Sequence, residues 1–222
     1  MNKYKLLSAA LATCLGTASF AQVQTVPANC EAMVTIHRES CMVSNYVRCG
    51  SVVEVHSYEN GKLSDSHYFG PDWDLLRYQA EGGRTDASVV EGSAPEASLT
   101  QALETGESLG TREMAFSTGV LKGNMVDLKS ELRFGDEEVQ ISGETYRVGT
   151  LVRDMTVRKN GVVSLWSFQV LAAPDASLLI EGQVDVEQFG KVQTLAWTPT
   201  KIVGPDETGF MTTQPLPGCS GS

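Results

Sequence analysis

The amino-acid sequence predicts a mostly β fold: an antiparallel meander curled into a barrel or half-barrel, with one short helix in a long central loop. Polar and apolar residues alternate with a period of two over long stretches, as they do in strands with one buried face. Asn-Gly pairs, which favour type I′ hairpin turns, occur twice, and glycines inside predicted strands mark places where a sheet bends. A β-sandwich is the alternative arrangement of the same strands.

The first predicted element is a secretory signal peptide. Residues 1–21 carry two lysines near the start, continue without charge, and end in the small-residue site Ser19-Phe20-Ala21. This pattern predicts cleavage near Ala21 and a periplasmic or secreted protein. Cys14 offers an alternative, as the lipidated residue of a lipoprotein. Nothing in the sequence reaches the roughly 20 continuous apolar residues of a membrane-spanning helix, so we expect no transmembrane segment.

The mature chain is expected to form a single all-β exported domain over residues 22–222. Its predicted parts are a first meander at about 31–80, a loop with the short helix at about 81–112, a second meander at about 113–203 and a tail at 204–222.

Four cysteines remain after the leader: Cys30, Cys41, Cys49 and Cys219. In an oxidising compartment they predict two disulfides, for which three connectivities are possible. A turn centred on Asn45 would set Cys41 opposite Cys49, which favours the pairs Cys41–Cys49 and Cys30–Cys219. The spacing lacks the C-x-x-C pair typical of zinc, iron–sulfur and redox sites.

The first meander contains the most chemical-looking stretch, the hairpin at residues 52–69. With Asn60-Gly61 as its two-residue turn, Glu54 would face His67 and His56 would face Asp65. All four side chains would then share one face. Imidazole and carboxylate suit a divalent metal, so His56, His67, Glu54 and Asp65 are the candidate metal ligands.

The same hairpin residues also fit a plainer interpretation, in which they form solvated ion pairs on an exposed face. His37 would add a third nitrogen to a metal site only if its strand lay alongside the hairpin. A divalent metal is therefore possible, and no other cofactor is expected.

The central loop contains the one good helix candidate. Ser93-Ala94-Pro95-Glu96 has the form of a capping box, and Leu99 and Leu103 give an apolar stripe over 95–105.

The second meander begins with the clearest strand, at residues 125–134, where Val126, Leu128 and Leu132 share the dry face. The stretch 178–187 repeats the pattern, with Ile180 and Val184 on the dry face. Strands are also predicted at 138–148, 150–159, 162–171 and 192–198. Glycines at 143, 149 and 182 predict bends or bulges in this meander. Glu181 and Gln183 are expected on the wet face of the strand at 178–187.

Charge and motifs exclude several functions. The whole chain has a formal net charge of −10, and loss of the leader removes two further lysines. An acidic surface without a basic cluster excludes nucleic acid and anionic lipid as partners. The sequence has no G-x-S-x-G, S-x-x-K, H-E-x-x-H, G-x-G-x-x-G or Walker loop, which leans against an enzyme.

The function predicted first is a non-enzymatic binding or carrier module for an apolar small ligand or lipid. Its cavity would be lined by Leu128, Leu132, Ile180 and Val184. Alternatives are an envelope structural or interaction protein, a metal-binding protein that uses the 52–69 hairpin, and an enzyme with an unrecognised site. The sequence makes no prediction of the oligomeric state.

Overall fold

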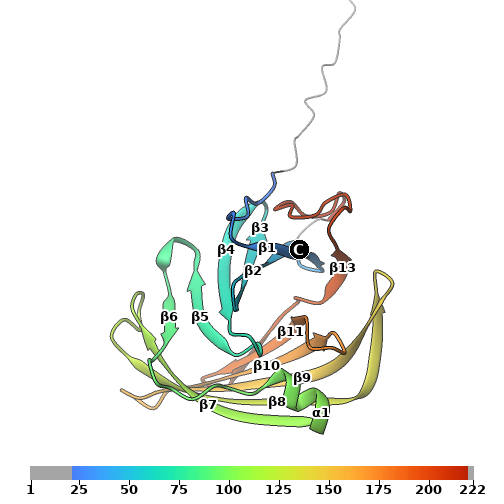
Figure 1. Cartoon of the computed structure of the whole chain (residues 1–222). Coiled ribbons are helices and arrows are strands. Elements are labelled where there is room, and N and C mark those ends of the chain that lie inside the picture. Colours follow the sequence, from blue (N-terminus) through green and yellow to red (C-terminus); the bar gives the residue numbers. More distant parts are fainter. Residues whose placement is uncertain (1–21, 220–222) are drawn as a thin grey trace, which may run out of the picture.

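The computed structural model describes residues 22–219, so the predicted signal peptide, the Ala21 cleavage site and Cys14 lie outside the described residues. Within that range the mostly β prediction is confirmed. Thirteen strands form one antiparallel sheet that is curled but not closed, as in a half-barrel, and it is accompanied by one α-helix (Figure 1).

The strands follow one another along the chain. They are β1 (Glu31–Arg38), β2 (Met42–Cys49), β3 (Val52–Glu59), β4 (Lys62–Phe69), β5 (Leu75–Ala80), β6 (Asp86–Val89), β7 (Glu107–Phe116), β8 (Met125–Ile141), β9 (Glu144–Val157), β10 (Val163–Ala172), β11 (Leu179–Gln188), β12 (Lys191–Leu195) and β13 (Pro199–Val203). The helices are the single turn η1 (Glu81–Gly83) and α1 (Leu99–Thr105).

The order of strands explains the curl. Each strand from β1 to β12 pairs with its neighbours in sequence, whereas β13 pairs with β1 at the opposite end of the sheet from β12. Only residues 196–198 join β12 to β13, and a link of that length spans about 13 Å at most. The two ends of the sheet therefore lie close together.

Arg38 connects the two ends of the sheet by hydrogen bonds. Its guanidinium donates to the carbonyl oxygen of Glu181 in β11 at 2.5 Å and to that of Trp197 in the link at 2.6 Å.

The curl brings the inner faces of the two halves of the sheet together. Figure 1 shows β1–β4 above β7–β11, with β5 and β6 at one side and β13 at the other. Side chains of both halves make one apolar core, which includes Ile36, Tyr46, Phe69, Trp73, Leu128, Leu132, Leu151, Phe168 and Val184. The predicted alternation of buried and exposed residues over 125–134 is confirmed.

The helix is shorter than predicted and starts later. Its N-cap is Ser98, whose hydroxyl accepts a hydrogen bond from the Gln101 N–H at 3.0 Å, so the predicted capping box at residues 93–96 is wrong. Leu99 and Ala102 are buried against the sheet. Glu96, expected as a cap residue, points instead into the interior.

Two strands occupy the predicted central loop. The short strand β6 and the first half of β7 lie within residues 81–112, so the sheet continues through this region without a break. Four residues of β6 are too few for a period of two to stand out in the sequence.

The glycines of the second meander have three different places, and the strands predicted at 138–148 and 150–159 are instead the end of β8 and the whole of β9. The hairpin turn lies at Ser142-Gly143, and Gly149 is inside β9 opposite Phe134. A Cβ at residue 149 would lie 2.6 Å from the Phe134 ring, so only glycine fits beneath that ring. The predicted irregularity at Gly182 is confirmed, because the register of β10 and β11 shifts there.

The shift at Gly182 also corrects the face predicted for Glu181. This residue lies opposite Val170, on the inner face of the sheet, and it is 7% exposed.

The cysteines form two disulfides, as predicted, but the favoured pairing is wrong. The bonds join Cys30 to Cys49 and Cys41 to Cys219. Strand β2 runs straight through Asn45, and the turn lies before it, at residues 39–41. Cys30 and Cys49 therefore meet at the same end of the paired strands β1 and β2.

The C-terminal segment, residues 204–219, covers the outer face of β1 and β2. The Met211 N–H donates to Thr35 Oγ1 at 2.7 Å, and the Asn45 side-chain amide donates to the Thr212 carbonyl oxygen at 3.0 Å. The Cys41–Cys219 bond fastens the end of the segment. Among residues 22–219 no helix has the length and apolar character needed to cross a membrane.

Candidate functional site

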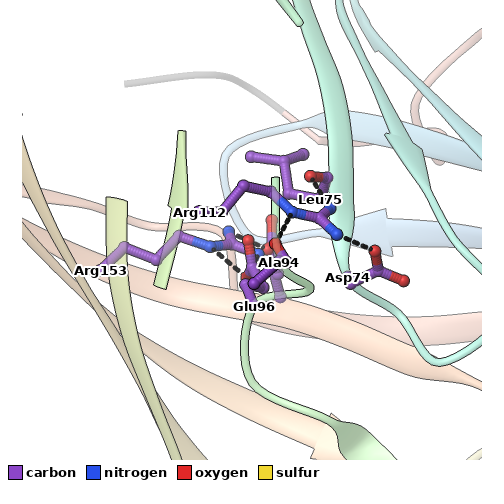
Figure 2. A network of polar contacts seen from close by, with 7 residues as sticks. Asp74, Leu75, Ala94, Glu96, Arg112 and Arg153 are labelled. Carbon is purple, nitrogen blue, oxygen red and sulfur yellow. Dashed lines mark hydrogen bonds and ion pairs between the residues drawn. The ribbon is translucent and has the colours of Figure 1, made fainter. Parts of the chain in front are cut away.

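A buried ion network lies where the two halves of the sheet meet. Arg153 of β9 is 4% exposed and sits between two carboxylates. Its Nε and Nη2 donate to Glu96 Oε1, both at 3.0 Å (Figure 2). Its Nη1 donates to Glu181 Oε1 at 2.5 Å. We call Glu96, Arg153 and Glu181 the inner network. It joins β9, β11 and the segment that precedes α1.

A second arginine ties that same segment to β5. Arg112 Nη2 lies 2.6 Å from Asp74 Oδ2, and the guanidinium donates to the carbonyl oxygens of Ala94 at 3.0 Å and Leu75 at 2.7 Å (Figure 2). Together the two arginines hold the chain on both sides of Pro95 inside the curl.

The two carboxylates of the inner network have opposite pKa shifts. Burial raises the pKa of Glu96, and the nearby Arg153 only partly offsets this effect. Burial also acts to raise the pKa of Glu181, but Arg153, His67 and Arg38 together outweigh it and lower the pKa. Glu181 is therefore the ionised partner of Arg153, and Glu96 is the member that takes up a proton first.

One oxygen of the inner network stays unused. Glu96 Oε2 is buried and has no hydrogen-bond partner within residues 22–219, and the same holds for the hydroxyl of Ser130, the cross-strand neighbour of Arg153. Unpaired buried polar atoms weaken a network rather than strengthen it.

The cavity beside the inner network is small. Its volume is about 20 Å³, room for roughly one water molecule. It is lined by Arg38, Met42, Tyr46, Val55, Ser57, Asp65, His67, Phe69, Leu179, Glu181 and Trp197. Burial raises the pKa of Tyr46 to about 12, so this hydroxyl stays protonated near neutral pH. Asp65 pairs with His67, Arg38 donates to the Glu181 carbonyl oxygen, and the space between these groups is too small for a substrate.

The four predicted metal ligands do not converge, because the register of the hairpin differs from the prediction. A bulge between Ser57 and Tyr58 shifts the pairing by one residue, so Val55 faces His67 and His56 faces Ser66. The predicted pairs Glu54–His67 and His56–Asp65 are wrong.

The shift divides the ligands between the two faces of the hairpin. Glu54 and His56 pair on the outer face, with Oε2 and Nε2 3.2 Å apart, whereas Asp65 and His67 pair on the inner face, with Oδ1 and Nδ1 3.5 Å apart. His37 lies under the C-terminal segment and not beside this hairpin. In the described part of the chain no group of three or more His, Cys, Asp or Glu side chains is placed to hold a metal.

The predicted cavity residues are packed into the core. Leu128, Leu132, Ile180 and Val184 are at most 2% exposed, and all four belong to the core cluster shared by both halves. Their apolar surface is already buried against other side chains.

Sequence reasoning missed the inner network, although a signal for it exists. Arg112 and Arg153 occupy positions where the period of two calls for an apolar residue, between buried neighbours such as Leu151 and Met114. A charge at an apolar position of a strand indicates a buried ion pair. Its partners could not be found in this way, because Glu96 is in a loop and Glu181 directly precedes the register shift at Gly182.

The outer face of β7–β10 carries an exposed apolar strip. Leu109 is 65% exposed and Val163 is 47% exposed, and Val152 and Leu165 lie between them on the same face. A shallow, open hollow lies over Leu109, Val152 and Leu165 of this strip. Its rim also includes Thr111, Lys129, Glu131 and Asp154. We call Leu109, Val152, Val163 and Leu165 the outer strip.

Comparison with protein-family models, with curated proteins and with solved structures finds no match for this chain.

Proposed function

We propose that this chain is an exported, non-enzymatic interaction module, which docks a basic and partly apolar protein segment of the envelope on its outer strip. The observation that carries the proposal is the contrast between the two faces of β7–β10. The inner face is filled by the protein's own core, whereas the outer face presents a hollowed apolar strip to solvent. Exposed apolar surface rimmed by polar residues is typical of protein-docking sites.

The charges around the outer strip favour a basic partner. Glu131 and Asp154 rim the hollow, and Asp185 and Glu187 continue the same face on β11. Lys129 is the one basic side chain in the rim. A partner with lysine or arginine beside its apolar residues would complement this charge, and the attraction would speed association.

The rest of the fold supports docking by keeping the outer face rigid. The two disulfides hold the ends of β1, β2 and the C-terminal segment together, and Arg38, Arg112 and Arg153 make hydrogen bonds and ion pairs on the inner side of the sheet. A rigid, preorganised surface loses less conformational entropy on binding.

Export is part of the proposal. The predicted leader with cleavage near Ala21 and the two disulfides both support a periplasmic or extracellular location.

The other predicted functions have less support. A carrier for an apolar ligand or lipid needs interior space, and the cavity inside the curl has a volume of about 20 Å³. A metal-binding hairpin needs its ligands on one face, and the bulge after Ser57 separates them.

Site-specific photo-crosslinking in the native host tests the proposed function. A photoreactive residue at Thr111, on the rim of the hollow, should yield one defined adduct with a protein that contains a basic, apolar segment. The same residue at Val120, which is fully exposed and lies in the loop between β7 and β8 outside the lining of the hollow, is the control and should not yield that adduct. Identical adducts at both positions, or none at Thr111, would contradict the proposal.

Binding of the purified partner then tests the strip itself. Leu109→Ser combined with Leu165→Ser should weaken binding about tenfold or more and leave the far-UV circular dichroism unchanged. Unchanged affinity would place the interface elsewhere.

A further inference from the structure

We propose that the C-terminal segment, residues 204–219, is an acid-sensitive cover over the outer face of β1 and β2, and that protonation of His37 beneath it opens the cover. This inference rests on a region remote in sequence from the outer strip, and it is independent of the proposed function.

The environment of His37 carries the inference. The residue is 3% exposed, and neither ring nitrogen has a hydrogen-bond partner within the described residues. Burying a neutral imidazole without a hydrogen-bond partner costs free energy. Burying an imidazolium in the same place costs far more, because its charge also has no partner.

The ring lies at a pocket between the sheet and the cover. The pocket has a volume of about 150 Å³ and is lined by His37, Arg38, Glu39, Cys41, Met42, Thr200, Pro215, Leu216 and Cys219. The cover contributes Pro215, Leu216 and the disulfide-bonded Cys219, none of which carries a charge. Opening at this place would admit water to the imidazolium.

The charged groups around His37 make its protonation unfavourable while the cover is closed. From β13, Lys201 is its cross-strand partner, and from its own strand Arg38 follows directly. Its partner on β2 is the uncharged Val43. The one carboxylate in the pocket lining is Glu39, which is exposed.

The cover's own carboxylates do not reach this pocket lining. Asp206 and Glu207 are exposed, and Glu207 Oε2 accepts a hydrogen bond from the Gly204 N–H at 2.6 Å.

The sign of the pH dependence follows from these neighbours. Burial and then Lys201 lower the pKa of His37 below its ordinary value of about 6.5. The closed state therefore has its full stability above about pH 6.5 and loses stability as the pH falls toward the lowered pKa. Opening exposes the ring to water and restores its ordinary affinity for a proton.

The attachment of the cover limits the change to a local opening. Its central residues 211–213 are buried and are held by hydrogen bonds with Thr35, Asn45 and residues 22–24. The Cys41–Cys219 bond keeps its far end on the sheet, so the opening is reversible. A terminal segment that lies outside the strand ladder can open at lower free energy than the whole fold.

Hydrogen exchange of the intact, disulfide-bonded chain tests this inference. Exchange is measured by mass spectrometry at about pH 7.5 and about pH 5, after correction for the intrinsic exchange rate. In the wild type, protection of residues 205–218 should fall about tenfold or more at the lower pH, while β8–β10 should stay protected. His37→Phe should remain protected at both pH values, and His56→Gln, the matched control, should behave as the wild type.

Two further measurements keep the inference falsifiable if His37→Phe fails to fold. The chain has three histidines, so the His37 ring is resolvable by NMR, and it should titrate together with the opening. Lys201→Gln should lower the pH at which the cover opens, because the closed state then tolerates the His37 imidazolium better. A cover that stays protected at pH 5 in the wild type, a His37 ring that titrates without any opening, or an opening unchanged in His37→Phe would overturn the inference.

Discussion

Strand β9 and the residue after it offer a comparison between two arginines, each bound by two carboxylates, in different surroundings. Arg153 binds Glu96 and Glu181 inside the curl, where its side chain is 5% exposed. Arg158, just beyond the end of the strand, binds Glu113 and Asp127 on the surface, where its side chain is 41% exposed. Each is one guanidinium shared by two carboxylates.

The two clusters differ in whether water can solvate the carboxylates once the arginine is removed. If Arg158 is removed, water solvates Glu113 and Asp127, so little stability depends on that cluster. If Arg153 is removed, two carboxylates remain buried without a counter-ion, which costs far more than the pair gained. The inner network therefore fixes how the halves of the sheet meet, and the surface cluster does not.

The largest expected effect comes from breaking the inner network. Arg153→Met should lower the free energy of unfolding by about 3–5 kcal/mol, because it leaves Glu96 and Glu181 buried and unpaired. Urea unfolding followed by tryptophan fluorescence measures this loss. A loss within the error of the measurement would show that the two carboxylates reach water or other partners.

A smaller effect is expected from Glu181→Gln and Glu96→Gln, which replace a carboxylate by a carboxamide of the same shape. Glu181→Gln should destabilise the fold by about 1–3 kcal/mol near neutral pH, because it removes the ionised partner of Arg153. Glu96→Gln should cost less, because burial already disfavours the charged form of Glu96. Urea unfolding of both variants at one pH gives the order, and the reverse order would contradict the assignment of charge.

Glu96 and Glu181 should also affect the pH dependence of stability in opposite directions. The raised pKa of Glu96 means that the folded state binds a proton more tightly than the unfolded state does, so this residue's contribution to stability falls as the pH rises above about 4.5. The lowered pKa of Glu181 has the opposite sign, and its contribution is lost as the pH falls below about 4.5. Relative to the wild type, Glu96→Gln should therefore be most stable at the alkaline end of a series from about pH 5 to about pH 8. A difference that does not change with pH would refute this.

The smallest effect is expected at the surface cluster. Arg158→Met should have the same urea midpoint as the wild type. The difference between the two midpoints should also stay near zero when salt is added. A clear loss of stability in Arg158→Met would mean that solvent exposure does not explain the difference in energy between the two clusters.

The sequence predicted the parts of this molecule that depend on local pattern. The alternation over 125–134 and the Asn-Gly turn after Glu59 follow from side-chain period and turn chemistry, and both are present. The parts that depend on an inserted residue were predicted only in part. Gly182 indicated an irregularity, but the pattern did not show the bulge after Ser57 or the inner face of Glu181. The bulge after Ser57 and the shift at Gly182 each move a row of side chains to the other face.

The inner network and the disulfide pairing share this limit. Glu96 reaches Arg153 over 57 residues, and Cys41 reaches Cys219 over 178 residues. Such contacts are set by how the whole sheet curls, which no local pattern encodes.

The central claim is that the interior serves to hold the fold and that the outer strip serves to bind. The most direct test replaces the inner network by apolar residues of similar size, with Glu96→Leu, Arg153→Met and Glu181→Leu in one chain carrying the photoreactive residue at Thr111. Apolar replacement of a whole buried ion cluster is often neutral or stabilising, so this variant should fold. The account predicts the same crosslinked adduct in the same yield as the parent chain. A folded variant that loses the adduct would contradict it.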